Sequence, residues 1–187
     1  LRPAPGALAI ETAGWRYVPL DPDATASRAY AAFPGNGCCY AVATSILGPL
    51  AERFGLPYRE FPLEMMKYGN GGVAGLRSLC GVMNAGAAMI GLFVTDGRAR
   101  GELTRTLGDW LETTELPIFS PESEGAHAVP RSPGASILCG AALTAWKTAT
   151  GLTETGERCR RVTADAARKT VELLNAHARS LRAGTAE

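Results

Sequence analysis

The positions of the cysteines constrain this chain more than any other feature, because four of its five cysteines coincide with predicted helix starts. The four, each with the helical run that follows, are Cys38 before 39–54, Cys80 before 81–93, Cys139 before 140–150 and Cys159 before 163–181. A helix N-terminus favours a thiolate, since its unpaired backbone N–H groups and macrodipole stabilise negative charge. Four such positions predict helix ends that converge on an anionic or metallic group. An iron–sulfur cluster held by four thiolates is the first candidate.

The bulk composition excludes several classes of protein. At 187 residues the chain is long enough for one domain with a sizeable core. Its 19 basic and 18 acidic residues nearly balance, so nothing indicates binding to nucleic acid or to an anionic membrane. No apolar run reaches the roughly 18–20 residues of a membrane span. The sequence contains no C-x-x-C, which excludes thioredoxin-like motifs, common zinc ribbons and covalent haem attachment, and His127 and His177 are too few for a His-rich metal site.

Disulfide bonding is left open by the cysteine count. Five cysteines are an odd number, which argues against a simple disulfide framework, although two bridges and one free thiol are arithmetically possible. The sequence begins at Leu1 rather than with Met, so we expect a mature or trimmed form of the protein.

The hydrophobic pattern predicts a mostly α, single-domain helical bundle with long connecting loops. An extended N-terminal arm is expected at 1–20, with Trp15 and Tyr17 packed onto the body, and the cysteine-containing redox domain at 21–187. The expected helices cover 24–33, 39–54, a short helix near 61–68, 81–93, about 103–111, 140–150 and 163–181. For the last of these, Thr163 is expected as the N-cap and Asp165 in the first turn.

Glycines mark two places where the backbone is expected to approach another group closely. The loop at 69–72 reads Gly-Asn-Gly-Gly, and Gly71 and Gly72 are candidates for bringing backbone N–H groups against cluster sulfurs. A turn that merely requires positive φ is the simpler alternative. The apolar helix at 81–93 carries three glycines, each of which costs roughly 1 kcal/mol relative to alanine, so a neighbour or cofactor is expected to lie close to it.

The cysteine segments resemble a family described as redox-active, which has the cysteine pattern C–GCAxxG–C–C and includes the split-Soret cytochromes c. The matching segments are Gly37-Cys38-Cys39-Tyr40-Ala41-Val42, Phe61–Gly72, Leu79-Cys80-Gly81-Val82-Met83-Asn84, Ser136-Ile137-Leu138-Cys139, Glu157-Arg158-Cys159 with Val162–Asp165, and in the arm Trp15-Arg16-Tyr17 with Leu20-Asp21-Pro22. The similarity covers nearly the whole chain.

The resemblance implies a role for each cysteine. Cys38, Cys80, Cys139 and Cys159 would be the shared cysteines that hold an iron–sulfur cluster, of [2Fe–2S] or [4Fe–4S] type, and Cys39 would be the extra one. Family members with haem attach it through a motif that this chain lacks, so haem is expected only non-covalently or through a segment outside this chain. Gly140 stands where close relatives are expected to carry histidine, which removes any function that depends on that side chain. The family also implies a possible homodimer and a periplasmic or otherwise exported location, with a cytoplasmic location as the alternative.

Other candidate residues have ordinary structural interpretations. The methionines Met65, Met66, Met83 and Met89 are expected to fill core space, and His127 to lie on the surface of the loop at 118–133. His177 is expected on the apolar side of the last helix, Glu64 on a helix surface, and Cys39 in the core. Arg158, Arg160 and Arg161 either lie near the cluster, where they would raise its potential and form a rim for docking, or form a solvated basic turn.

The sequence thus favours an electron carrier or redox module over a stand-alone enzyme, since no catalytic acid–base pair is evident. Its partner would be another redox protein. The rival hypotheses are a non-redox helical module stabilised by disulfides or structural zinc, and an enzyme that uses an open iron site.

Overall fold

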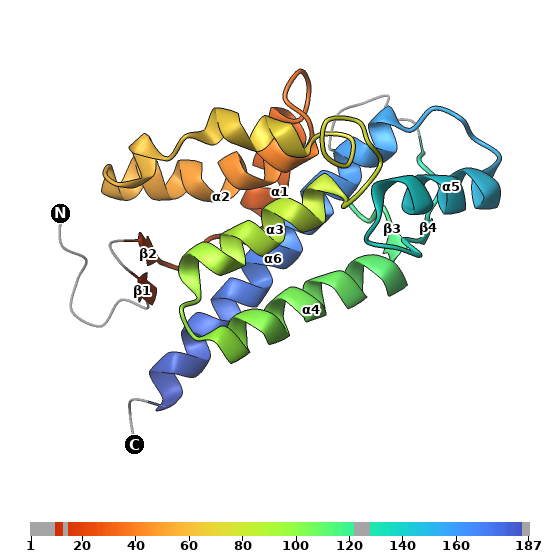
Figure 1. Cartoon of the computed structure of the whole chain (residues 1–187). Helices are drawn as coiled ribbons and strands as arrows, with labels where there is room; N and C mark the ends of the chain where they lie inside the picture. Colours follow the sequence, from red (N-terminus) through yellow and green to blue (C-terminus); the bar gives the residue numbers. More distant parts are fainter. Residues whose placement is uncertain (1–9, 13–14, 122–127, 185–187) are drawn as a thin grey trace.

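The computed structural model describes residues 10–12, 15–121 and 128–184, and within them the protein is mostly α, as predicted (Figure 1). The helices are α1 (Pro22–Ala32), α2 (Cys38–Phe54), the 3₁₀ helices η1 (Tyr58–Glu60) and η2 (Leu63–Gly69), α3 (Gly81–Phe93), α4 (Gly97–Thr113), α5 (Cys139–Thr150) and α6 (Gly156–Gly184). The strands are β1 (Ile10–Thr12), β2 (Trp15–Tyr17), β3 (Glu115–Leu116) and β4 (Ser132–Pro133). Among the helices of these ranges, none is long and apolar enough to cross a membrane.

Helix α3 is the buried centre of the fold, as its all-round apolar sequence predicted. It packs against α2, α4 and α6 (Figure 1), and Ala85, Met89, Ile90 and Phe93 along it are fully or almost fully buried. A Cβ at Gly86 would meet the side chain of Leu107 on α4 and Thr170 on α6. The glycine therefore lets three helices approach closely, which offsets its intrinsic helical cost.

The first two long helices begin and end at local signals. Asp21 caps α1 by accepting hydrogen bonds from the backbone N–H groups of Asp23 and Ala24 at 2.8 and 3.0 Å. Gly37, at φ 82°, precedes α2, and Gly55, at φ 73°, follows it. Left-handed backbone at both ends is easily adopted by glycine, so the chain can turn sharply on either side of α2.

The start of α6 differs from the prediction. The helix begins at Gly156, seven residues before Thr163, which is buried in its interior and donates its hydroxyl to the Cys159 carbonyl at 2.7 Å. Asp165 is also buried inside the helix, and its carboxylate accepts backbone N–H groups from the segment after β3 at 2.8 Å. Both residues suit a helix cap, but Thr163 bonds within the helix and Asp165 bonds to a distant segment. The predicted cap was therefore wrong.

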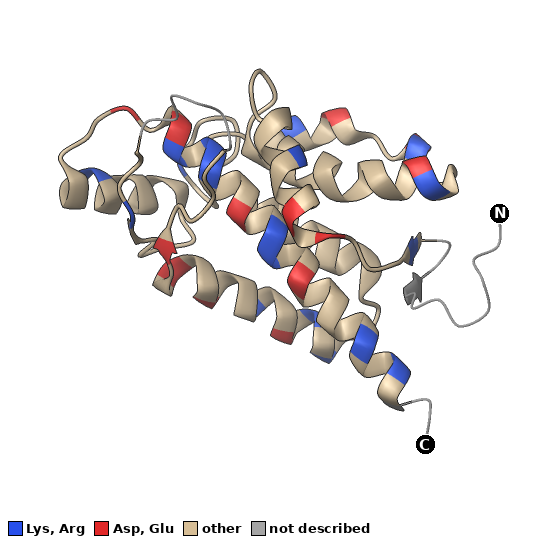
Figure 2. Cartoon of the chain, turned by 180° about the vertical axis from the view of Figure 1, so that it is seen from behind, with Lys and Arg blue, Asp and Glu red and all other residues tan. Residues whose placement is uncertain are grey.

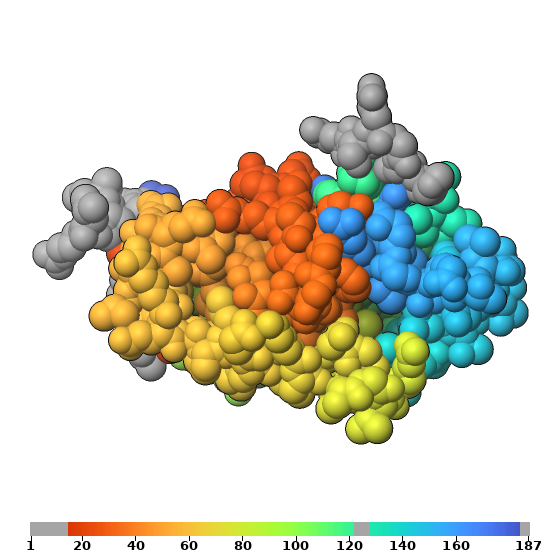
Figure 3. Space-filling model, turned by 90° about the horizontal axis from the view of Figure 1, so that it is seen from above, coloured from red at the N-terminus to blue at the C-terminus, as the bar shows by residue number. Residues whose placement is uncertain are grey.

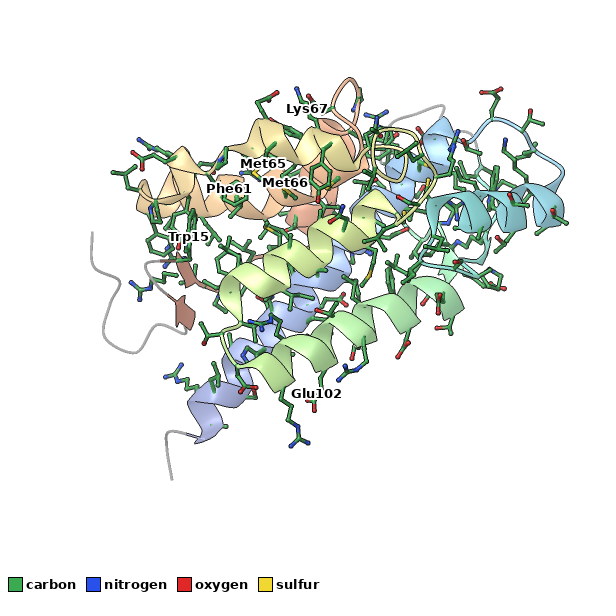
Figure 4. All side chains as sticks on the ribbon, in the orientation of Figure 1. Trp15, Phe61, Met65, Met66, Lys67 and Glu102 are labelled. Atoms are coloured by element: carbon green, nitrogen blue, oxygen red, sulfur yellow. The ribbon has the colours of Figure 1, made fainter. Side chains whose placement is uncertain are left out.

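The described part of the N-terminal arm is a hairpin that packs onto the body, as expected. β1 pairs antiparallel with β2, and Tyr17 is fully buried and donates its hydroxyl to Asn175 on α6 at 2.7 Å. The Trp15 ring packs edge-on against the rings of Tyr58 and Phe61, with distances of 5.4 and 5.8 Å between ring centroids (Figure 4). Through these contacts with segments far along the sequence, Tyr17 and Val18 belong to the core, and Trp15 and Leu20 pack against it.

Smaller predictions had mixed outcomes. Met66, Met83 and Met89 are buried, but Met65, labelled on η2 in Figure 4, is 55% exposed, so its predicted core role was wrong. The predicted surface loop at 118–133 contains β4, which pairs antiparallel with β3. His127 lies outside the described residues.

Candidate metal centre

The starts of α2, α3, α5 and α6 gather around the loop of residues 70–77, which we call the glycine loop (Figure 1). In Figure 3 this part of the chain, in yellow, lies beside the cyan and blue segments that contain α5 and the start of α6. A cavity of about 200 Å³ lies between these helix starts, and we call it the cysteine cavity. Its lining contains all four predicted ligands, Cys38, Cys80, Cys139 and Cys159. The remainder includes the apolar side chains Phe33, Val82, Leu143 and Val162, the glycine loop, and the arginines Arg77 and Arg158. Cysteines up to 121 positions apart in the sequence are thus brought to one place.

Each of the four cysteines stands at a helix start. Cys38 and Cys139 are the first residues of α2 and α5, and Cys80 immediately precedes α3 as its N-cap. Cys159 lies in the first turn of α6 rather than ahead of the helix, because α6 begins earlier than predicted. The helix-start placement on which the sequence argument depended is therefore present at every position, with this one shift of register.

The thiols are close enough to influence one another's protonation. Burial raises the pKa of Cys38 to about 12, with a smaller upward contribution from the neighbouring thiolate of Cys80, while a backbone N–H of Gly71 acts to lower it. Burial likewise raises the pKa of Cys80 to about 11, and Cys139 and Cys159 act in the same direction. Four thiolates in one buried space repel each other, so their joint deprotonation requires a nearby positive charge. A coordinated metal supplies such a charge.

Arg158 is the cation that acts most strongly on the Cys159 sulfur, and it also acts on Cys80. Burial raises the pKa of Cys159, and Arg158 opposes this rise both by its charge and by a side-chain hydrogen bond to the sulfur. The exposed Arg77 contributes in the same, lowering direction. The site therefore already has positive charge on the side of Cys159, where negative charge on sulfur would be stabilised.

The glycine loop fits tightly around the cysteines, which goes beyond a simple turn. A backbone N–H of Gly71 is directed at the Cys38 sulfur. A Cβ at Gly72 would lie 2.6 Å from the Cβ of Cys139, so only glycine fits there without displacement. The loop needs positive φ at both residues, 64° and 73°, and Val73, Ala74 and Arg77 also have positive φ. The loop thus combines left-handed backbone with a close approach to Cys38 and Cys139, while its contact with a cluster stays a prediction.

Two further glycines lie directly against the sulfurs of the adjacent cysteines Cys38 and Cys39. A Cβ at Gly81 would lie 2.5 Å from the Cys38 sulfur, and a Cβ at Gly69 would lie 2.5 Å from the Cys39 sulfur. Cys38 lines the cysteine cavity, whereas Cys39 is completely buried in the core beside η2 and does not. The predicted core position of Cys39 agrees with this arrangement.

The three arginines at the start of α6 do not form a solvated turn or a basic docking rim. Arg158 and Arg161 are both buried, at 5% exposure. Arg160 stacks on the ring of Tyr30 at 3.7 Å and donates to its carbonyl at 2.9 Å. The sequence left a position near the cluster and a solvated turn as alternatives. The solvated turn is excluded because Arg158 packs on Trp146, Arg160 on Tyr30, and Arg161 pairs with Glu157 in the same helix.

Arg77 and the apolar walls were not found by sequence reasoning. A Cβ at Gly140 would come within 3.1 Å of the Arg77 Cβ, and the Gly140 N–H donates to the Arg77 carbonyl at 2.9 Å. Arg77 therefore lies against the place where a side chain at position 140 would begin. No local pattern predicts this, because the contact joins two segments more than sixty residues apart.

The other sequence candidates lie outside the cavity lining. Glu64 is exposed and pairs with Lys67 at 2.7 Å, as expected of a helix-surface charge. His177 is half-buried on α6. All five cysteines are free thiols, which gives no support to a disulfide framework. Within the described ranges, no three His, Cys, Asp or Glu side chains already stand in the arrangement that holds a metal ion.

The donor set and its surroundings fit an iron–sulfur cluster. Four thiols are the usual ligands of such clusters, and the cavity between them has room for more than a single ion. Glycine at 81 leaves out a side chain that would crowd the Cys38 sulfur, and glycine at 72 leaves out one that would crowd the Cys139 Cβ. The Nε of Arg158 is buried and has no hydrogen-bond partner among the described residues. A buried cation beside four thiols suits an anionic group.

Comparison with known proteins identifies a redox-active family. The family described as "Putative redox-active protein (C_GCAxxG_C_C)" matches residues 39–173. The chain belongs to this family. It is also 35% identical over 173 residues to the split-Soret cytochrome c of Desulfovibrio desulfuricans, a match that covers 87% of this chain and 61% of that protein. The chain thus spans about three fifths of the length of this curated relative.

A solved structure shows the same fold. It is described as a novel iron centre in the split-Soret cytochrome c from Desulfovibrio desulfuricans ATCC 27774, and it matches with a TM-score of 0.82 at 33% identity. The match covers 87% of this chain and 71% of that one. The family match begins at Cys39, so it includes Cys39 and leaves out Cys38. Of the two cysteines, only Cys38 lines the cysteine cavity, so its role as the ligand stays a prediction that rests on this geometry.

Proposed function

We propose that this chain is a one-electron redox protein whose iron–sulfur cluster is held by Cys38, Cys80, Cys139 and Cys159. The observation that carries the proposal is the convergence of four thiols, from four separate helix starts, on one cavity. The iron centre named for the split-Soret cytochrome c, which has the same fold, supports iron as the metal.

The residues of the cavity would each contribute to holding such a group. Helix N-termini and the Gly71 N–H direct partial positive charge at the sulfurs, while Phe33, Val82 and Leu143 form apolar walls that exclude water. When bound, the cluster supplies reversible one-electron exchange. The protein contributes the ligands, the low dielectric and the fixed dipoles that set the potential.

The size of the cavity favours a multinuclear centre over structural zinc. Four thiolates around one zinc ion at about 2.3 Å would place their sulfurs about 3.8 Å apart, with no cavity between them. The cysteine cavity instead leaves about 200 Å³. Haem, which was expected only non-covalently or through another segment, is not part of the proposal.

Electron exchange with a partner protein needs a centre close to the surface. Cys80 and Cys159 are only partly buried, so the edge of the cavity that they form is the proposed point of exchange. The exported location and the homodimer implied by the family stay predictions. Fractionation of the native host and sedimentation of the purified protein would test them.

The deciding experiment is metal analysis of anaerobically prepared protein, with iron, acid-labile sulfide, zinc and the visible spectrum measured on one sample. Iron and sulfide in matching amounts, with absorption bleached by dithionite, are expected. Cys80→Ser and Cys139→Ser should each lose the cluster, whereas full incorporation in both variants would refute the ligand assignment. Stoichiometric zinc without iron would refute the redox function and favour a structural module.

A further inference from the structure

The start of α6 carries an unusual charge pattern for a helix N-terminus. Its first six residues are Gly156-Glu157-Arg158-Cys159-Arg160-Arg161, with three cations and one acid. Figure 2 shows these basic positions at the end of α6 that lies near α5. A helix N-terminus carries partial positive charge, so a cation in the first turn is disfavoured unless something negative lies beside it.

Arg158 and Arg161 form a matched pair that isolates this effect. They lie one helical turn apart and both are 5% exposed. Arg161 has an acidic partner, since its Nε donates to Glu157 at 2.7 Å. Arg158 has no carboxylate within ion-pair distance in the described ranges 15–121 and 128–184, and its Nε is buried without a hydrogen-bond partner there.

The surroundings of Arg158 show where its missing negative partner would have to be. Its side chain lines the cysteine cavity, is hydrogen-bonded to the Cys159 sulfur and lies over the ring of Trp146 at 5.8 Å. The aromatic face covers one side of the guanidinium. The cavity is the neighbouring space that holds several groups able to carry negative charge, namely the four cysteine sulfurs. A buried charge without an opposite charge is strongly disfavoured, so the geometry points to an anion in the cavity.

We infer that Arg158 is the counter-cation of the metal centre: it holds the bound cluster electrostatically and raises its reduction potential. This inference rests on the proposed function and adds to it the residue that sets the potential. A reduced cluster is more negative than an oxidised one, so a fixed cation beside the sulfurs stabilises the reduced form more. Among residues 15–121 and 128–184, the same cation has no carboxylate to pair with in the cluster-free protein.

The inference predicts that removing Arg158 weakens the cluster-bound protein but does not destabilise the cluster-free protein. A general structural role would destabilise both forms. In Arg158→Met, the cluster should have a lower midpoint potential and should be lost to a chelator about tenfold faster or more, because a charge-assisted hydrogen bond is removed. The cluster-free form of the same variant should keep or raise its melting temperature, because methionine fills the space without a buried charge. Arg158→Lys should recover part of the potential, since it retains the charge.

Arg161→Met is the matched control. It removes an equally buried arginine, but leaves Glu157 without this partner and does not touch the cavity lining. Its cluster-free form should melt at a lower temperature than the parent, while its midpoint potential should shift much less than that of Arg158→Met.

The assay is a redox titration of the reconstituted protein followed by visible absorption, with chelator release and thermal melts on the same preparations. A potential in Arg158→Met that is unchanged or higher than in the parent overturns the inference. So does a cluster-free Arg158→Met that is destabilised as much as Arg161→Met. If the parent protein binds no iron and sulfide, the proposed function and this inference both fail. If the parent binds a cluster and only the arginine variants deviate from expectation, the inference alone fails.

Discussion

Replacing Gly72 by alanine tests the tight fit between the glycine loop and the cysteines. Gly72 has φ 73°, and an added Cβ would lie 2.6 Å from the Cys139 Cβ and 2.8 Å from the backbone nitrogen of Ser78. Gly75 in the same loop has φ 79°, but a Cβ there would meet nothing within 4 Å. Gly75→Ala is therefore a matched control that changes the backbone preference and leaves the contacts unchanged.

The expected losses of stability follow from these two terms. Left-handed backbone costs alanine roughly 1–2 kcal/mol at either position. At Gly72 the overpacking against Cys139 and backbone atoms adds about 1–3 kcal/mol. Gly72→Ala should therefore lose about 2–5 kcal/mol and Gly75→Ala about 1–2 kcal/mol. The difference between the variants measures the contacts of the added Cβ with Cys139 and with the backbone of Arg77 and Ser78, because the effect of alanine on the unfolded chain is shared.

Urea unfolding of the cluster-free proteins measures both losses of stability, and iron retained after reconstitution measures the effect on the centre. Gly72→Ala should retain less iron than Gly75→Ala, because the Cys139 backbone must shift to accommodate the new Cβ. Equal losses of unfolding free energy in the two variants would refute the close packing of the loop against Cys139.

Three further predictions concern the vicinal cysteines, the central helix and pH. Cys38→Ser should abolish iron binding, whereas Cys39→Ser should retain it, as metal analysis would show; the reverse result would exchange their roles. Gly86→Ala should lose about 1–3 kcal/mol in urea unfolding through overpacking against α4 and α6. Gly91→Ala should gain up to about 1 kcal/mol, since its nearest neighbour would lie 3.9 Å away. In the cluster-free protein, burial raises the pKa of Cys80 from 9.0 to about 11, so the folded state holds this proton more tightly than the unfolded state. The unfolding free energy should therefore fall as pH rises from 9 towards 11, and less steeply in Cys80→Ala; equal slopes would contradict the shift.

The sequence predicted the fold where the signals are local. The helix at 81–93 was predicted with its structural bounds because it is apolar on all sides and is followed by a polar, glycine-containing turn. The helix after Asp21 was predicted because its cap is formed by residues next to it. At α6 the prediction failed, because Thr163 and Asp165 have the chemistry of a cap but make their bonds deep inside a helix.

For the candidate site, the sequence by itself determined that four cysteines lie at helix starts, that glycines lie near them and that a covalent haem motif is missing. All of these are properties of short segments. Only the tertiary structure decided that the four helix starts converge, that Cys38 rather than Cys39 lines the cavity, and that Arg158 is buried there without a carboxylate partner in the described ranges. The physical reason is that packing between segments far apart in the chain decides two things. It decides which side of a helix start faces the cavity and which charge lies beside it. Helix-start chemistry, by contrast, depends on a few consecutive residues.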